Sequence, residues 1–515
     1  MNDHGKSDRR VVPTKLPNKD RGGQATTARG EPGARGTERP ELAEAAEGSH
    51  LAKGNTQQRP MLRTQGRVGM SPELERVRQA AKQDRKMRFT ALLHHVYRLD
   101  TLRAAYLRLK RSAAPGVDGV TWQQYGEHWE ANLQDLAARL KRGAYRAQPT
   151  QRRYIPKADG QRRPLGVTAL EDKIVQSALV EVLNAIYEVD FLGFSYGSRP
   201  GRSQHNALDA LWVGIARSKV NWVLDADIRG FYDAMRHDWL VKFIEHRIAD
   251  RRVVRLIQKW LTAGVLEDGQ IKASEVGSPQ GASFSPLAAN LYLHYVFDLW
   301  AHRWRQQHCR GDVRIVRYVD DIIVAFEQRQ EAEHFLAALR LRLTAFGLEL
   351  HPTKTRVLEF GRFAQERRQA QGLGKPATFN FLGFTHVCGQ SRQGRFRVER
   401  RTMATRLRAK LAEVKAQLRQ RQHKAIPEQG TWLRSVLLGH YQYYGVPLNA
   451  KALERFQRAV TRLWRRSLSR RSQKGTVPWE RMQRYVARWI PKVRIYHPHP
   501  DMRFGVTTQG RSPVR

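Results

Sequence analysis

Cysteine is scarce in this sequence: only Cys309 and Cys388 occur in 515 residues. Two cysteines so far apart indicate no disulfide framework, and they fit a protein of the reducing cytosol. Long apolar runs are also missing, because no stretch approaches the roughly 20 apolar residues that cross a bilayer. The N-terminus lacks the apolar core of a secretory signal. We therefore expect a cytoplasmic protein with no membrane partner.

Acidic residues are few relative to basic ones, since 48 Asp and Glu stand against 91 Lys and Arg. A solvated basic face explains a single charge run, but a formal net charge of +43 is spread along the whole chain. A polyanion is therefore the expected main partner, and binding should weaken steeply with salt. The length allows several domains with sizeable cores.

Large apolar side chains are also sparse in residues 1–70, which are rich in Gly, Pro, Arg, Lys, Thr and Gln. Such a segment cannot bury enough apolar surface to offset its chain entropy, so we predict a disordered basic leader. Residues 71–145 are predicted to form a helical N-terminal extension that begins with Ser71 as N-cap and proline at the first helical position. One helix is expected over residues 121–142. Another apolar helix face is expected from Phe89, Leu92, Leu93, Val96, Leu99 and Leu102.

The stretch from Arg314 to Phe326, Arg-Ile-Val-Arg-Tyr-Val-Asp-Asp-Ile-Ile-Val-Ala-Phe, predicts a β-hairpin. Alternation places Ile315 and Arg317 on the same face of its first strand, while Asp320 and Asp321 fall at the turn. An Asp-Asp pair is typical of β-turns. Two like charges between apolar strands are nevertheless unfavourable unless a cation compensates them. Because paired carboxylates suit Mg²⁺, a divalent metal site is the functional alternative.

A second carboxylate run precedes the hairpin in the sequence Trp-Val-Leu-Asp-Ala-Asp-Ile-Arg-Gly-Phe-Tyr-Asp, residues 222–233. Asp225 and Asp227 share one face by the period of a strand, and either could join the hairpin carboxylates. Three such residues could hold two Mg²⁺ ions roughly 3.5–4 Å apart, the spacing of two-metal sites. A site of this kind activates a primer 3′-hydroxyl and stabilises the leaving pyrophosphate.

The Tyr-Val-Asp-Asp hairpin and the Asp-Ile-Arg-Gly-Phe-Tyr-Asp strand together resemble the palm of reverse transcriptases. Further motifs in the same order narrow the resemblance to the reverse transcriptase/maturase proteins of bacterial group II introns. It runs from about Leu92 to the C-terminus. The resemblance implies an α+β fold, a right-hand polymerase with fingers, a ferredoxin-like palm, a helical thumb/maturase domain and a basic tail. The implied domains are 146–388 for fingers and palm, 389–470 for thumb and domain X, and 471–515 for a DNA-binding tail.

The resemblance also assigns roles around the carboxylates. In the family the metal ligand directly precedes Ile-x-Gly, which favours Asp227 over Asp225. Tyr232 would pack beneath the nucleotide sugar and collide with a 2′-hydroxyl, the group that separates the two nucleotide classes. Lys354 would protonate or neutralise the leaving pyrophosphate. The implied metal site comprises Asp227, Ile228, Asp320 and Asp321.

Three loops resemble segments that bind nucleotide or template. Residues 154–166 predict two short strands around a turn, with Lys157 and Arg163 either as solvated charges or as a clamp on the triphosphate. The sequence Gly-Ser-Pro-Gln-Gly at 277–281 is a common kind of loop, but in the family Pro279, Gln280 and Gly281 line the dNTP pocket. It would open a helix that runs to about Trp304. The basic loop 194–203 is expected at the template backbone.

The C-terminal part is expected to be helical and basic, with helices at 400–421, 431–444 and 450–470. The sequence Leu-Gly-His-Tyr-Gln-Tyr-Tyr-Gly-Val-Pro, residues 438–447, fits ordinary helix packing but resembles domain X. Tail aromatics among arginines suit phosphate contacts and base stacking. Because no cysteine follows Cys388, we expect neither the cysteine-rich endonuclease of many relatives nor a zinc ion.

The resemblance implies Mg²⁺-dependent synthesis of DNA from dNTPs on an RNA template. The implied partners are group II intron RNA, an RNA template with a DNA primer, and target DNA; a homodimer is left open. The expected location is the bacterial cytosol, near the nucleoid. Rival functions are an RNA-dependent RNA polymerase, an RNA-binding splicing factor, and a domesticated relative in repair or defence.

Overall fold

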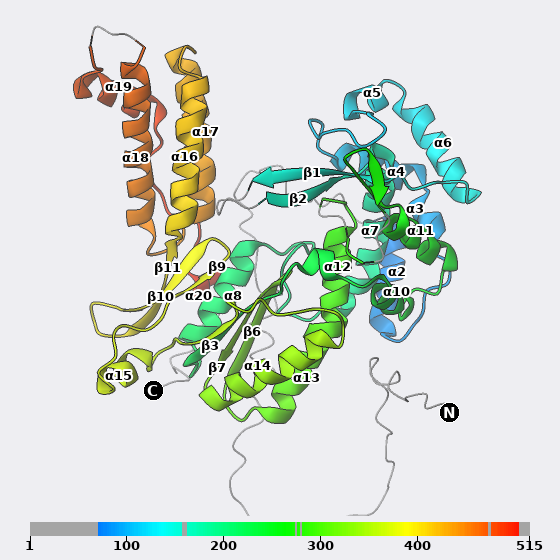
Figure 1. Ribbon diagram of the computed structural model, residues 1–515, viewed down its shortest axis with the longest axis horizontal. Helices are drawn as coiled ribbons and strands as arrows, with labels where there is room; N and C mark the ends of the chain where they lie inside the picture. Colours follow the sequence, from blue (N-terminus) through cyan, green and yellow to red (C-terminus); the bar gives the residue numbers. More distant parts are fainter. Residues whose placement is uncertain (1–70, 157–161, 273–275, 279–280, 472–474, 504–515) are drawn as a thin grey trace, which may run out of the picture.

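A central β-sheet separates a group of N-terminal helices from a group of long C-terminal helices (Figure 1). This computed structural model describes residues 71–156, 162–272, 276–278, 281–471 and 475–503. The predicted leader therefore lies outside the described residues. Among the described helices, none is long and apolar enough to span a membrane. Cys309 and Cys388 are both free.

The N-terminal helices pack beside the long helix α7 (Leu170–Asp190). The Ser71 side chain accepts the N–H of Leu74 at 3.3 Å, which confirms the predicted N-cap. The helix expected over 121–142 is divided at His128, whose φ of −130° is not helical. The helices are α2 (Pro72–Gln83), α3 (Leu93–Val96), α4 (Leu99–Arg108), α5 (Trp122–Glu127) and α6 (Trp129–Lys141).

The prediction that one helix with an apolar face runs from Phe89 to Leu102 was wrong, because this segment contains two short helices. The Asp250 carboxylate accepts hydrogen bonds from the N–H groups of Leu92 and Leu93 at 2.8 and 3.0 Å. Helix α3 therefore begins only at Leu93. Arg98 is extended, with ψ 134°, and separates α3 from α4. A carboxylate from a distant part of the chain thus overrides the local periodicity.

A four-stranded sheet in the order β2-β1-β4-β5 lies next to α7 (Figure 1). Strands β1 and β2 are antiparallel, as predicted for residues 154–166, and β4 is parallel to β1. The strands are β1 (Thr150–Pro156), β2 (Arg162–Val167), β4 (Val265–Glu267) and β5 (Gln270–Lys272).

The central sheet has the order β6-β7-β3-β8, and all its neighbours are antiparallel. Its strands are β3 (Trp222–Asp227), β6 (Val313–Tyr318), β7 (Asp321–Phe326) and β8 (Arg356–Glu359). Helices, with β4 and β5 of the other sheet among them, separate β3 from β6, and α14 separates β7 from β8. The strands of this sheet therefore follow one another in the order β-α-β-β-α-β. These helices are α9 (Phe231–Ala234), α10 (His237–Glu245), α11 (Arg251–Thr262), α12 (Ser285–Leu293), η2 (His294–Asp298), α13 (Leu299–His308) and α14 (Arg329–Thr344).

Both faces of the central sheet are buried. Ile315 and Val324 join one core with α7 and α12, whereas Val316 and Ile323 join a second core with α8 (Gln204–Ala216). The alternation predicted for the hairpin is therefore confirmed. Polar side chains of this sheet therefore lie at the strand ends, or at positions where a partner compensates the cost of burying them.

The helix predicted to run to about Trp304 is present but contains a π-helical segment, η2, between α12 and α13. Segments of this type are rare and often lie at functional sites. Gly347, at φ +74°, ends α14, because its N–H reaches Thr344 and the next N–H reaches Leu343. This glycine cap was also predicted.

A three-stranded sheet, β11-β10-β9, links the centre to the long C-terminal helices. The helix expected from Arg400 begins later, because residues 400–402 belong to β11 and the Arg400 guanidinium pairs with buried Asp209 at 2.5 Å. The elements are α15 (Ala364–Ala370), β9 (Phe379–Phe381), β10 (Phe384–Gln390), β11 (Phe396–Thr402), α16 (Ala404–Gln420), α17 (Ile426–Tyr444), α18 (Ala450–Ser469), α19 (Trp479–Trp489) and α20 (Pro500–Arg503).

The chain after α19 returns to the central domain. The N–H groups of Tyr496 and His497 donate to the carbonyl of Gly445 at 2.8 and 3.0 Å. Further on, Arg217 forms a two-point ion pair with Asp501, at 3.1 and 2.6 Å. These residues connect the end of α17 with the end of α8.

Candidate active site

The hairpin of β6 and β7 carries the adjacent aspartates, as predicted. Tyr318 is the register partner of Asp321, which leaves Val319 and Asp320 as a two-residue turn. Val319 has φ +59°, a left-handed conformation that is unfavourable for a β-branched residue. The surrounding structure must therefore hold this turn in place.

Asp227, at the end of β3, is the register partner of Asp321 in β7. Residues paired in this way have Cβ atoms about 4.5–5.5 Å apart, so the two carboxylates are close neighbours. Lys354 Nζ lies 3.1 Å from Asp227 Oδ2, and Thr355 Oγ1 accepts the N–H of Asp227 at 3.3 Å. The fold thus brings Lys354 to the carboxylates from a third segment.

The register also distinguishes Asp227 from Asp225. Asp225 is paired with Ile323, and Arg356 Nε lies 3.8 Å from its carboxylate. Both aspartates have a basic neighbour, but Asp225 faces an apolar residue across the strands, whereas Asp227 faces a carboxylate. This arrangement favours Asp227 as the cation ligand.

Two of these carboxyl groups, Asp225 and Asp321, have a raised pKa. Burial raises the pKa of Asp225 to about 6; Arg356 opposes this rise and Asp227 adds to it. The pKa of Asp321 is raised to about 7, first by enclosure among protein atoms and then by Asp320, Asp227 and Asp225. Asp321 keeps exposed surface, but its like-charged neighbours alone would push its pKa in the same direction.

This donor set fits a divalent cation. Crowded carboxylates are relieved by a proton or a metal ion, and hard oxygen ligands suit Mg²⁺. The side chain of Ile228 is a hydrocarbon, so only its main-chain carbonyl can supply an oxygen. Within the described ranges, however, no three His, Cys, Asp or Glu side chains are grouped closely enough to hold a metal ion as they stand. The two-ion site remains a prediction.

Tyr232 lies beside the loop that was predicted to bind nucleotide. Its carbonyl accepts the N–H of Ser278 at 2.8 Å, and the same carbonyl lies 3.2 Å from where a Cβ on Gly277 would sit. The neighbouring Pro279 and Gln280 lie outside the described residues. The fold therefore joins the Tyr232 segment to the beginning of this loop.

Gly281, at the other end of the loop, approaches β2. It has φ +118°, and a Cβ at this position would lie 2.6 Å from the carbonyl oxygen of Gly166. The absence of a side chain at Gly281 thus lets its backbone approach the backbone of β2 closely. Arg163 also lies in β2, opposite Ile155, whereas Lys157 lies outside the described residues.

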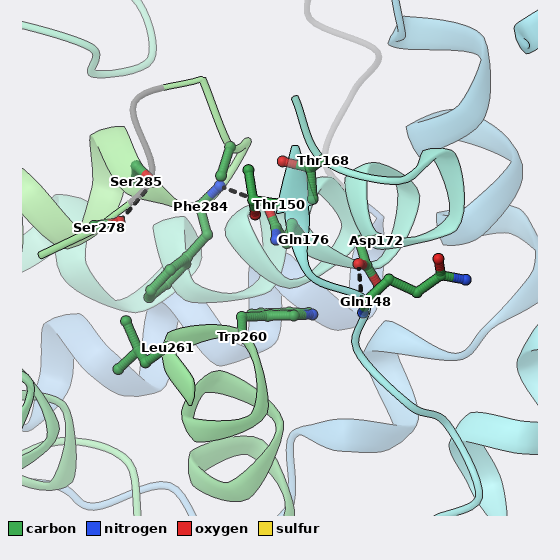
Figure 2. A pocket seen from close by; sticks show the side chains of 11 residues that line it. Gln148, Thr150, Thr168, Asp172, Gln176, Trp260, Leu261, Ser278, Phe284 and Ser285 are labelled. Atoms are coloured by element: carbon green, nitrogen blue, oxygen red, sulfur yellow. Dashed lines mark hydrogen bonds between the residues drawn. The ribbon is translucent and has the colours of Figure 1, made fainter. Parts of the chain in front are cut away.

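Figure 2 shows a small cavity where this loop meets β1, α7 and α11. Its lining includes Thr150, Thr168, Asp172, Gln176, Trp260 and Ser278. Gln176 Oε1 accepts the N–H of Phe284 at 3.3 Å, which fixes the end of the loop. The volume of about 10 Å³ has room for roughly one water. A nucleotide must therefore bind outside this cavity.

The basic loop at 194–203 does not present all its arginines to solvent. The Arg199 side chain is 2% exposed and pairs with Glu188 at 3.0 Å. Its Nη1 also donates to the carbonyls of Leu192 and Ser195. Arg199 therefore stabilises the loop, and it cannot reach a template from this position.

Sequence reasoning missed the most heavily bonded residue near the hairpin turn. Arg317 and Asp298 are both fully buried and form a two-point ion pair. A signal was present, since alternation places Arg317 on the same face as the buried Ile315. The partner could not be identified from sequence.

Residues 155–386 match the family described as reverse transcriptase (RNA-dependent DNA polymerase). The match includes Asp225, Asp227, Asp320, Asp321 and Lys354. This part of the chain is thus similar to reverse transcriptases.

Curated relatives agree with this assignment. Over 244 residues, 46% of this chain and 63% of the relative, the sequence is 36% identical to Protein YkfC of Escherichia coli (strain K12). It is 34% identical over 222 residues to the group II intron-encoded protein LtrA of Lactococcus lactis subsp. cremoris, covering 43% of this chain and 37% of LtrA. Nuclear intron maturase 2, mitochondrial, of Arabidopsis thaliana is 30% identical over 112 residues, which are 21% of this chain and 15% of that protein. The chain thus spans less than two thirds of the length of each of these relatives.

Proposed function

We propose that this chain is an RNA-directed DNA polymerase of the right-hand type. The central sheet is the palm, the β2-β1-β4-β5 sheet with α7 forms the fingers, and α16, α17 and α18 form the thumb and maturase domain. The observation that carries the proposal is the register pairing of Asp227 with Asp321 inside the reverse transcriptase domain. A fold gains no stability from two facing carboxylates, so their presence needs a chemical reason.

In this reaction a primer 3′-hydroxyl attacks the α-phosphorus of a dNTP, and pyrophosphate leaves. Bound Mg²⁺ supplies a lowered pKa for that hydroxyl and charge neutralisation for the phosphates. Asp227, Asp320 and Asp321, with the carbonyl of Ile228, would hold the two ions. Lys354 lies beside Asp227, where its ammonium can share the charge of the departing pyrophosphate.

The nucleotide is proposed to bind between the palm and the fingers. Tyr232 supports the sugar and discriminates against a 2′-hydroxyl. Lys157 and Arg163 clamp the triphosphate, and the loop of Pro279, Gln280 and Gly281 lines the pocket. The hydrogen bond between the Tyr232 carbonyl and Ser278 supports this assignment, because it joins the sugar and loop positions.

The proposed partners are a group II intron RNA, an RNA template with a DNA primer, and target DNA. The printed names of the LtrA and Arabidopsis relatives support the intron RNA, and the net charge of +43 supports polyanions in general. A splicing factor that never polymerises would have no use for the carboxylate group, which disfavours that alternative. The tail, 471–515, is assigned to DNA, and a homodimer is left to direct measurement.

Primer extension on an RNA template distinguishes the carboxylates. Asp227→Asn should lower dNTP incorporation by more than about 100-fold, because losing a ligand should exceed the 10- to 100-fold effect of losing a supporting residue. Asp225→Asn should lower dNTP incorporation by clearly less than Asp227→Asn does. Asp135→Asn on the distant helix α6 is the charge-matched control and should match the wild type. A folded wild-type protein that binds the primer-template but incorporates nothing with Mg²⁺ would contradict the proposal.

A further inference from the structure

Arg317 is the third residue before Asp320, and it lies in β6 with no exposed surface. A guanidinium has five N–H donors, and here each one has an acceptor. Nε and Nη2 donate to the two carboxylate oxygens of Asp298 at 2.7 and 2.6 Å. The remaining donors reach Asn290 Oδ1 at 3.0 Å, the Val319 carbonyl at 3.0 Å and Ser195 Oγ at 2.7 Å.

One of these hydrogen bonds holds the strained turn of Val319 and Asp320 in place. The bond from Arg317 to the Val319 carbonyl fixes the peptide that leads directly into Asp320. A second segment also contacts this turn, because a Cβ on Gly197 would lie 2.5 Å from the Val319 nitrogen. The Gly197 carbonyl in turn accepts a hydrogen bond from Asn290 Nδ2 at 2.7 Å. Arg317 and Asn290 therefore connect the turn and the Gly197 loop to one continuous helical segment.

The π segment makes this convergence possible. Asn290 lies in α12 and Asp298 ends η2. At their separation a regular α-helix would leave the two side chains roughly 80° apart around its axis. The extra residue of a π turn takes back about 100° of that rotation, which returns both side chains to one side. They can then meet the same guanidinium.

Stability alone does not account for such a pair. Removing two charges from water is costly, and a well-packed apolar pair often serves the fold equally well. The pair carries no net charge, so its influence on the nearby carboxylates is mainly geometric. What it adds over an apolar pair is the directed hydrogen bond to Val319.

We propose that Arg317 is a positioning residue, held by Asp298, that fixes the Val319–Asp320 turn so that the Asp320 and Asp321 carboxylates present their oxygens together. The inference rests on the proposed function, since it gives the carboxylates their task as cation ligands. Arg317 itself touches neither substrate nor metal.

The test compares Arg317→Lys with the paired variant Arg317→Met/Asp298→Leu, using full-length protein. Lysine keeps the charge opposite Asp298, but three donors on one nitrogen cannot replace five donors on a planar fork. The paired variant removes both charges and leaves an apolar contact of similar volume. The melting temperature shows whether each variant folds. If the paired variant does not fold, Arg317→Lys still tests the inference.

Two readouts separate positioning from a structural role. Mn²⁺ binding, followed by electron paramagnetic resonance of the free ion, should weaken about tenfold in both variants, as for residues that support metal ligands. In primer extension kcat should fall about tenfold or more, while KM for the primer-template should stay within about twofold of wild type. A folded variant with wild-type Mn²⁺ affinity and kcat would overturn the inference. If the wild type binds Mn²⁺ but does not polymerise, the proposed function fails, and the Mn²⁺ comparison alone still decides the role of Arg317.

Discussion

Asp227 and Asp321 face each other as register partners on the neighbouring strands β3 and β7. Like charges in this position destabilise a sheet, and no local turn or cap requires them. Asp225 and Asp320 add further negative charge nearby, as the raised pKa of Asp321 reflects. The central sheet thus accepts a local electrostatic penalty at the place where we propose that the cations bind.

Neutralising Asp321 should separate stability from activity. Asp321→Asn removes the repulsion from Asp227 at nearly unchanged volume, so the melting temperature without Mg²⁺ should rise by about 1–3 °C. Primer extension should fall by more than about 100-fold. Asp135→Asn, measured in parallel, weakens only an exposed ion pair with Arg139, so it should leave primer extension unchanged and should not raise the melting temperature. A variant that loses stability and activity together would argue for a structural role of Asp321.

The carboxylates should make stability fall with rising pH in the absence of Mg²⁺. The pKa of Asp321 is about 7 and that of Asp225 about 6 in the folded protein, above the ordinary value for Asp. Between about pH 4 and pH 7 the folded state therefore binds more protons at these groups than the unfolded state does. Their contribution to stability thus declines across this window, whereas Mg²⁺ should stabilise more at pH 8 than at pH 5.5.

Melting temperatures of the wild type and Asp321→Asn at several pH values, with and without Mg²⁺, measure this effect. The difference between the two proteins without Mg²⁺ should grow from pH 5 to pH 8 and shrink when Mg²⁺ is added. An equal difference at every pH would contradict the assigned pKa shift.

Gly197 should not tolerate a side chain, although glycine itself has no group that could take part in the chemistry. A Cβ would lie 2.5 Å from both the nitrogen and Cγ2 of Val319, so alanine must displace the turn that carries Asp320. We expect Gly197→Ala to lower the rate of primer extension about tenfold or more, the scale of losing a supporting residue. Gly374→Ala is the matched control, because nothing lies within 4 Å of its Cβ position. Wild-type rates for both variants would show that the turn tolerates movement.

Two glycines of α17 should respond in opposite directions. A Cβ on Gly430 would overlap the Trp489 ring of α19, so Gly430→Ala should destabilise by about 1–3 kcal/mol through overpacking. Gly439 is exposed with no atom near its Cβ position, and Gly439→Ala should stabilise by up to about 1 kcal/mol through helix propensity. Urea unfolding followed by circular dichroism measures both. Equal effects would contradict the packing of α19 on α17.

Much of the fold could be predicted from local patterns. Strict alternation gave the hairpin and its two buried faces, and Ser71 and Gly347 marked the helix ends that the structure has. The resemblance to reverse transcriptases also predicted that Asp227 and Asp321 lie close together, because the motifs of a family keep one strand arrangement.

Contacts between distant segments could not be predicted. The start of α3 depends on Asp250, a carboxylate 158 residues from Leu92. The burial of Arg317 depends on Asp298, which only a π turn brings into position. Local periodicity contains neither fact. These are also the places where helix boundaries or site residues were missed.

Nucleic-acid binding should depend strongly on salt. Proteins with 6–10 phosphate contacts lose about 10³–10⁵ in affinity between 50 and 200 mM salt, and a charge of +43 predicts a loss on this scale. Fluorescence anisotropy with a labelled primer-template at several salt concentrations measures the slope. An affinity that barely changes with salt would exclude the phosphate backbone as the main source of binding.

The most direct test of the account is dNTP incorporation on an RNA template with a DNA primer, comparing the wild type with Asp320→Ala. The account predicts Mg²⁺-dependent extension by the wild type and its loss in a variant that still folds and still binds the primer-template. Undiminished extension by Asp320→Ala would show that the hairpin carboxylates are not the catalytic centre.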